Sequence, residues 1–214
     1  MKNFIKTFEE SIVRKPNNFI IIFFNPGMAG SALQRIFISH KELHHSFKNF
    51  GQRDYDDPIR YPDSSEGFLN YPNHTLPFKE QHLSCAHLNF YTPTDREEDI
   101  LKHYELIKQG KTIVFKTHDF SLYEKFKKSR CVFVIGNKQL NRGINFEVDM
   151  TSFTVPEKVF TVNINSLMSK DYDTFLDEYL KIVFEFDLTP RINSVRSFIL
   201  MWLERQERFK RTLS

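Results

Sequence analysis

Apolar and polar segments alternate along this chain in a pattern that predicts strands and helices in turn. Four short runs rich in β-branched and aromatic residues have the length and composition of buried strands: residues 20–24, 112–116, 132–135 and 159–164. Helical or loop-like sequence lies between them. Because parallel strands need crossover connections, this order predicts an α/β fold, a parallel sheet flanked by helices.

Helical spacing of apolar residues predicts five helices: from about residue 31 to 45, then about 95–109, 121–128, 169–186 and 192–212. The last two carry long apolar stripes, exemplified by Phe175 and Tyr179 on one and by Phe198 and Trp202 on the other. Gly110 is a stop signal for the second helix. The pattern therefore indicates ordinary helices with one face toward a core.

Residues 50–93 differ from the rest of the chain. They hold five of its nine prolines and show no sustained period. We interpret them as a long insertion after the first helix, forming a packed lid because aromatic residues recur in it. With 214 residues and 40% hydrophobic content, the chain is expected to form one domain over residues 1–214.

Residues 19–37, FIIIFFNPGMAGSALQRIF, join the first strand to the first helix through a turn that contains glycine. Gly27 and Gly30 permit close approaches that a Cβ would obstruct, and Ser31 is a candidate helix cap. A helix starting there directs backbone N–H groups at an anion. The turn is therefore a candidate phosphate-binding loop, with a plain βα turn as the alternative. The Walker lysine is absent after Gly30, which disfavours an ordinary ATPase or GTPase.

A second segment adds a cation and an imidazole to the same region. Lys116, Thr117 and His118 lie where the strand of residues 112–116 ends. In an open α/β sheet, ligands bind at the carboxyl ends of the strands, which is also the edge that carries the candidate loop. His118 has the chemistry of a general base, because the pKa of histidine lies near neutral pH.

In these two segments the chain resembles the P-loop sulfotransferases. Their phosphosulfate-binding loop reads Pro, then Lys or Arg, Ser or Thr, Gly, and two further Ser or Thr. Residues 26–32 are similar to it, with one additional residue before Gly30. The family's turn of Lys, Ser or Thr, and His matches Lys116, Thr117 and His118. The resemblance covers about residues 19–37 and 111–144.

The resemblance implies a three-layer P-loop-type fold and a donor, 3′-phosphoadenosine 5′-phosphosulfate (PAPS), that leaves as 3′-phosphoadenosine 5′-phosphate (PAP). A hydroxyl of a small molecule or saccharide would accept the sulfuryl group. His118 would be the base, and Lys116 would contact the donor oxygens. The remaining candidates for binding PAPS or PAP are Pro26, Gly27, Met28, Ala29, Gly30, Ser31, Ala32, Lys138 and Arg142.

Three positions depart from the family pattern. Met28 stands where the loop cation is expected, Gly136 where an Arg ends the strand, and Ile144 where a Ser holds the 3′-phosphate. Lys138 and Arg142 lie on the same segment and are candidates to replace that charge. Solvated surface charges are the other interpretation of these two residues.

Composition narrows the expected partners. The net charge of +3 is mild, so no nucleic-acid partner is expected. No apolar run reaches the about 18 residues of a membrane span, and the start of the chain lacks a signal-peptide core, which favours the cytoplasm. The histidine and cysteine spacings, such as His82, Cys85 and His87, lack the paired ligands of structural zinc, so no metal is expected.

A sulfotransferase-like enzyme is the leading hypothesis, and three alternatives stay open. One is a catalytically silent P-loop-fold protein that binds a nucleotide, glycan or protein through the same cleft. Another is a nucleotide or metabolite kinase-like P-loop enzyme. The last is a metal-dependent site built on the histidines of the insertion.

Overall fold

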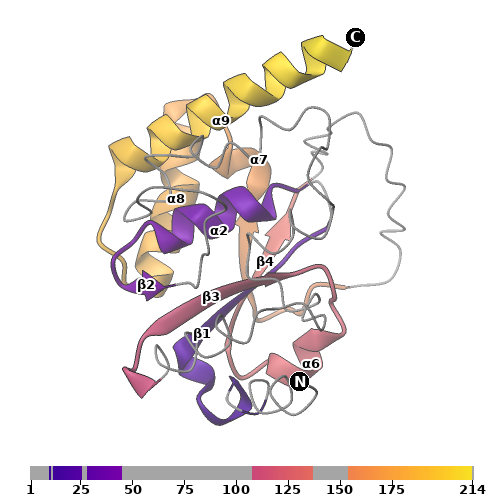
Figure 1. The fold of residues 1–214 in the computed structure, drawn as a ribbon, viewed down its shortest axis with the longest axis vertical. Helices are drawn as coiled ribbons and strands as arrows, with labels where there is room; N and C mark the ends of the chain where they lie inside the picture. Colours follow the sequence, from indigo (N-terminus) through magenta and orange to yellow (C-terminus); the bar gives the residue numbers. More distant parts are fainter. Residues whose placement is uncertain (1–9, 11, 26–27, 45–107, 137–153, 214) are drawn as a thin grey trace, which may run out of the picture.

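A parallel β-sheet forms the centre of the protein, shown here by a computed structural model that describes residues 10, 12–25, 28–44, 108–136 and 154–213 (Figure 1). All pairings are parallel, and the strand order is β2-β3-β1-β4-β5. The strands are β1 (Phe19–Phe23), β2 (Leu43–His44), β3 (Thr112–Thr117), β4 (Arg130–Ile135) and β5 (Phe160–Asn163). The four predicted strands and the α/β class are thus confirmed.

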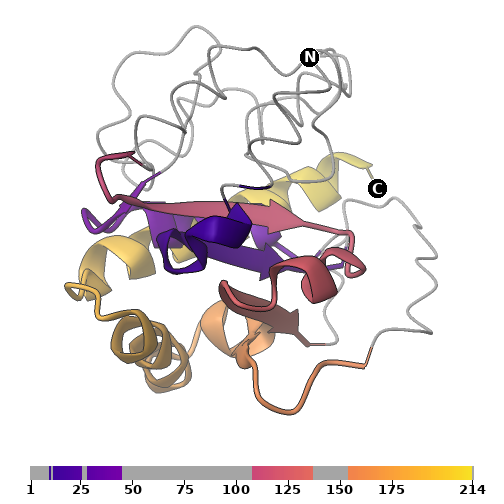
Figure 2. The same cartoon turned by 90° about the horizontal axis from the view of Figure 1, so that it is seen from below.

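Helices cover both faces of this sheet. They are η1 (Pro16–Asn18), α2 (Gly30–Ile38), α6 (Leu122–Phe126), α7 (Ile164–Leu167), α8 (Tyr172–Phe186) and α9 (Ile192–Leu213). Figures 1 and 2 show α2 and α9 on one side of the sheet and α6 on the other. The predicted helices over 121–128, 169–186 and 192–212 correspond to α6, α8 and α9.

The apolar run of β1 explains why it is central. Its five residues are all buried, and they alternate between two hydrophobic clusters. Ile20 and Ile22 pack with α2, α8 and α9, whereas Phe19, Ile21 and Phe23 pack with α6. A strand that contacts protein on both faces has no polar side to expose, and so its sequence is continuously apolar.

The connections place the carboxyl end of β1 at a change of direction. From β1, the chain passes through α2 to β2 and β3 on one side, whereas β4 continues to β5 on the other side. The chain therefore leaves the neighbouring strands β1 and β4 toward opposite sides of the sheet. In open α/β sheets, ligands bind beside such a point.

Several local predictions were wrong. The first helix ends at Ile38 rather than near residue 45, and the short strand β2 follows it. The strand predicted over 159–164 ends at Asn163, whose side chain accepts hydrogen bonds from the amides of Asn165 and Ser166 and so begins α7. By contrast, the stop signal at Gly110 was predicted correctly: Gly110 lies in the turn after the helical residue 108 and has a φ of +70°.

Other predictions fall outside the described residues: the insertion of 50–93, most of the helix of 95–109, and the zinc-ligand candidates within the insertion. In the described part of the chain, no helix has the length and apolarity needed to cross a membrane. The same part contains no group of three or more His, Cys, Asp or Glu that could hold a metal. Cys131 is buried, and burial raises the pKa of its thiol to about 12.

A buried polar network ties the end of α2 to the connection between α8 and α9. The Nδ1 of His40 lies 2.9 Å from the carbonyl oxygen of Thr189, and its Nε2 lies 3.4 Å from the hydroxyl of Tyr179. That hydroxyl accepts a hydrogen bond from the Arg191 amide at 2.8 Å, and Glu42 accepts one from the Thr189 amide. Because a carbonyl oxygen only accepts, Nδ1 carries the proton and Nε2 accepts from Tyr179 when His40 is neutral.

This network predicts that acid destabilises the fold through His40. Burial lowers the pKa of His40, and the charge of Arg191 adds to this, against opposing effects of the Thr189 hydrogen bond and Glu42. The unfolded chain therefore binds a proton at a higher pH than the folded chain does. The free energy of unfolding should fall as the pH is lowered from about 7 toward 5, which urea denaturation measures.

The matched variant is His40→Gln, which retains an amide donor and acceptor but does not titrate. Its free energy of unfolding should change less over this pH range, so that the difference between the two proteins narrows as the pH falls. Parallel curves for the two proteins would contradict the assignment to His40.

Candidate functional site

The candidate site begins at a close contact between Phe24 and the first turn of α2. A Cβ added to Gly30 would lie 2.2 Å from the Phe24 ring, far inside van der Waals contact. Gly30 is therefore required by an aromatic ring that lies against its Cα. The sequence predicted a close approach at this glycine, and in the structure Phe24 makes that approach.

The first residues of α2 have no capping side chain among the residues that the structure describes. Ala29 is the N-cap residue, in the left-handed conformation with a φ of +52°, and no side chain hydrogen-bonds there. The expectation that Ser31 caps the helix was therefore wrong, because α2 already begins at Gly30. Helix amides that lack a capping side chain can donate to an anion.

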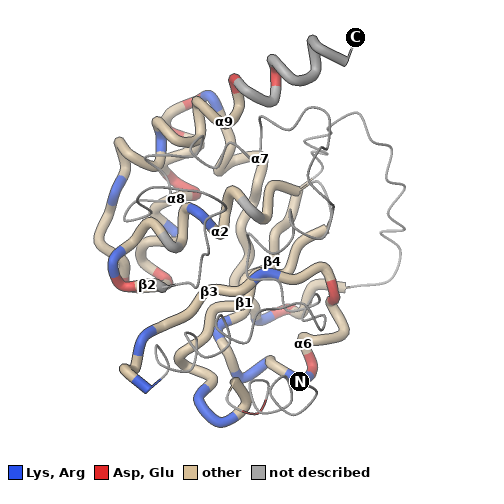
Figure 3. The backbone as a smooth tube through the Cα atoms, in the orientation of Figure 1, with Lys and Arg blue, Asp and Glu red and all other residues tan. Residues whose placement is uncertain are grey.

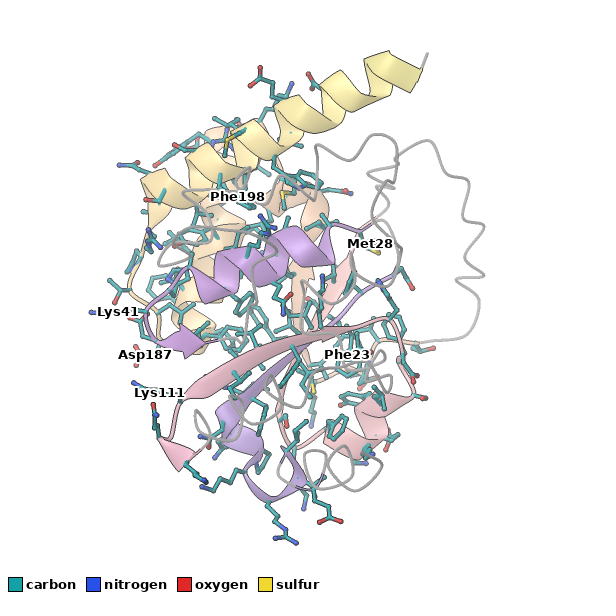
Figure 4. All side chains as sticks on the ribbon, viewed as in Figure 1. Phe23, Met28, Lys41, Lys111, Asp187 and Phe198 are labelled. Carbon is teal, nitrogen blue, oxygen red and sulfur yellow. The ribbon has the colours of Figure 1, made fainter. Side chains whose placement is uncertain are left out.

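The Met28 side chain is apolar and buried, so it cannot stabilise a charge. It is 5% exposed and belongs to the same hydrophobic cluster as Phe24 and Leu33. Figure 4 shows Met28 beside the start of α2. Because a lysine at this position would have to leave the cluster or bury its ammonium, the loop cation of the sulfotransferases has no simple counterpart here.

His118 is held against the end of β1. Its Nδ1 lies 2.8 Å from the carbonyl oxygen of Phe24, and its ring centroid lies 4.1 Å from that of Phe24. A carbonyl oxygen accepts only, so Nδ1 carries the proton of the neutral ring and Nε2 carries the lone pair. This tautomer is the one in which Nε2 can act as a base.

Lys116 lies on the same side of the sheet as α2. It pairs in register with Ile22, which faces α2, and its Nζ lies 5.9 Å from the centre of the Phe24 ring. Lys116 is only 1% exposed, although it carries an ammonium group. His118 follows the end of β3, and its ring, like the Lys116 ammonium, lies beside the Phe24 ring.

The predicted site residues are thus placed as follows. The structure brings Lys116, His118 and Gly30 together around Phe24. Ala29, Ser31 and Ala32 lie at the start of α2, and Met28 is buried before it. Pro26, Gly27, Lys138 and Arg142 lie outside the described residues. Nothing in the sequence pointed to Phe24, which reads as one more core residue of an apolar strand.

The end of β4 lacks room for a side chain that could bind a phosphate. Gly136 has a φ of +138°, and a Cβ there would lie 3.0 Å from Ile164 and 3.4 Å from Asn165. An arginine at this position would be strained by its backbone, and its Cβ would press on the Ile164 and Asn165 side chains at the start of α7. The departure from the family pattern at Gly136 is therefore built into the packing of β4 against α7.

Comparisons with models of known protein families, with curated proteins and with solved structures found no match to this chain.

The Phe24 contact predicts that Gly30→Ala destabilises the protein. The added methyl group overlaps the ring, and overpacking of this kind costs about 1–3 kcal/mol of the free energy of unfolding, measurable by urea denaturation. Combining it with Phe24→Ala should give less than the sum of the two single effects, since the overlap is then removed. Additive effects would contradict the contact.

Proposed function

We propose that the edge of the sheet formed by the ends of β1 and β3 binds the phosphates of a phosphonucleotide such as PAP, and that the protein is sulfotransferase-like. The observation that supports this most is the meeting of Lys116 and His118 beside the start of α2. A buried cation and helix amides without a capping side chain are both suited to an anion. The three-layer P-loop type of the fold is part of the same proposal.

The contacts at this edge suggest which phosphates would bind. The amides of Gly30 and Ala32 would donate to the 5′-phosphate, and Lys116 would approach the bond between this phosphate and the sulfuryl group. Gly136 offers no side chain for the 3′-phosphate. We therefore expect PAP to bind more weakly than it would with a full set of cationic ligands.

In the proposed reaction His118 acts as the general base. Its Nε2 would take the proton of an acceptor hydroxyl as the hydroxyl oxygen forms a bond to sulfur. The bond from sulfur to the bridging phosphate oxygen breaks, and PAP leaves with that electron pair. Lys116 would stabilise the charge that develops on the leaving oxygen. The hydrogen bond from Nδ1 to Phe24 keeps the ring in the tautomer that this step needs.

A second candidate is a catalytically silent binding protein that uses the same edge. It is favoured by the burial of Met28 within the hydrophobic cluster and by the packing at Gly136, since both remove groups that the family uses for charge. PAP binding without PAPS turnover would support this candidate. Selective binding of ATP would instead support the kinase-like alternative.

Replacing the buried ammonium tests the binding site. Lys116→Met keeps the length of the side chain and removes its charge, so we expect PAP affinity in isothermal titration to fall about 10- to 100-fold. Lys170→Met, at an exposed lysine between α7 and α8, is the matched control and should bind PAP as the unaltered protein does. Equal PAP affinity for all three proteins would exclude Lys116 from the site.

Replacing the imidazole tests catalysis. In a mixture of PAPS and alcohol or saccharide acceptors, His118→Asn should reduce PAP release about 10²- to 10⁴-fold, the usual contribution of a general base. PAP affinity should change little, because asparagine still has an N–H to donate to Phe24. Release of PAP at an unchanged rate in the variant would remove His118 from the reaction.

A further inference from the structure

The opposite edge of the sheet carries a strip of cations that the net charge of the chain conceals. Parallel strands all begin at one edge, and three neighbouring strands, β3, β1 and β4, are each preceded by basic residues. We call these residues the amino-edge patch: Arg14 and Lys15 before β1, Lys108 and Lys111 before β3, and Lys127 and Lys128 before β4. All six are exposed.

Hydrogen bonds between these segments hold the starts of the three strands side by side. The side-chain amide of Asn18 donates to the carbonyl oxygen of Lys111 at 3.2 Å, which joins η1 to the start of β3. Arg130 at the start of β4 donates to Thr112 of β3 at 3.4 Å, across the start of β1. Adjacent strands lie about 4.8 Å apart, so three strand starts span about 10 Å.

Few acidic residues offset this charge. Among the described residues of these segments, Glu10 pairs with Arg14 and Glu124 pairs with Lys127. Glu185 adds a negative charge that acts on Arg130 at the start of β4. The basic residues of the patch outnumber these three described carboxylates. Figure 3 shows the blue segments gathered along this side, and Figure 4 labels Lys111 there.

The patch has charged boundaries. On the side of β2, Lys41 is followed by Glu42, and Asp187 lies nearby in Figure 4. On the side of β5, Lys158 is preceded by Glu157. At both boundaries a described acid is next to the lysine in the sequence, unlike at the starts of β1 and β3.

We infer that the amino-edge patch binds the phosphate backbone of a nucleic acid without reading its sequence. A narrow strip of exposed lysines fits a linear polyanion, and its affinity would come from the release of counterions. A membrane surface is the less favoured partner, because Val13 is the one large hydrophobic residue of these described segments that is exposed. This binding is separate from the proposed function, which uses the opposite edge.

Fluorescence anisotropy with a labelled 20-nucleotide single strand and its duplex tests this inference. We expect binding at low salt that weakens steeply as salt is added. Phosphate contacts by Lys15, Lys111 and Lys128 alone would give a slope of log affinity against log salt of about −2 to −3. Nucleic acids of different sequence should bind equally well.

Two matched triple variants locate the binding. Lys15→Gln/Lys111→Gln/Lys128→Gln removes three charges from the patch, and its slope should become shallower by about 2 to 3. Lys41→Gln/Lys158→Gln/Lys170→Gln removes three charges elsewhere, and its slope should be nearly unchanged. Thermal melting of both variants verifies that each is folded.

Four results would overturn the inference: no binding at low salt, equal losses in the two triple variants, displacement of the oligonucleotide by saturating PAP, or binding to vesicles of anionic lipid but not to nucleic acid. Displacement by PAP would move nucleic-acid binding to the carboxyl edge and would leave the proposed function standing. If PAP binds nowhere on the protein, the proposed function is wrong, but the inference of nucleic-acid binding at the amino-edge patch is unchanged.

Discussion

The position of the Phe24 ring is the constraint on which the geometry of the candidate site depends. The ring lies against Gly30 on one side and within 4.1 Å of the His118 ring centroid on another. It therefore determines how closely α2 approaches β1 and where the imidazole is held. The Lys116 ammonium lies 5.9 Å from the same ring, so one aromatic side chain organises the cation, the base and the start of the helix.

The parallel direction of all five strands separates two edges of different chemistry. Among the described residues of the carboxyl edge, Lys116 is a buried cation, the Met28 side chain is buried and apolar, and the amides at the start of α2 are further donors. Such a site suits a small anion that can be desolvated. At the amino edge, exposed lysines precede three neighbouring strands, which suits a large polyanion that stays hydrated. The two proposals therefore concern different ligands as well as different places.

The sequence predicted what depends on long patterns and missed what depends on single contacts. Four strands were recognisable because a strand that is buried on both faces is apolar throughout. The helices α8 and α9 were recognisable because each has a long apolar stripe. The two residues of β2 are too few to show a period. The sequence also placed Lys116 and His118 at the same edge as the candidate loop, because parallel strands all end at one edge. The role of Phe24 could not be predicted, since a glycine such as Gly30 indicates a close approach without showing which group makes it.

Amide chemical shifts test most directly whether an anion binds at the start of α2. During a titration of the ¹⁵N-labelled protein with PAP, we expect the largest shifts at Gly30, Ser31 and Ala32, accompanied by His118. Inorganic sulfate should move the same α2 amides in the same direction, because it offers the same charge. If PAP moves the amides near Lys111 instead, or leaves those of α2 in place at saturation, the start of α2 is not the binding site.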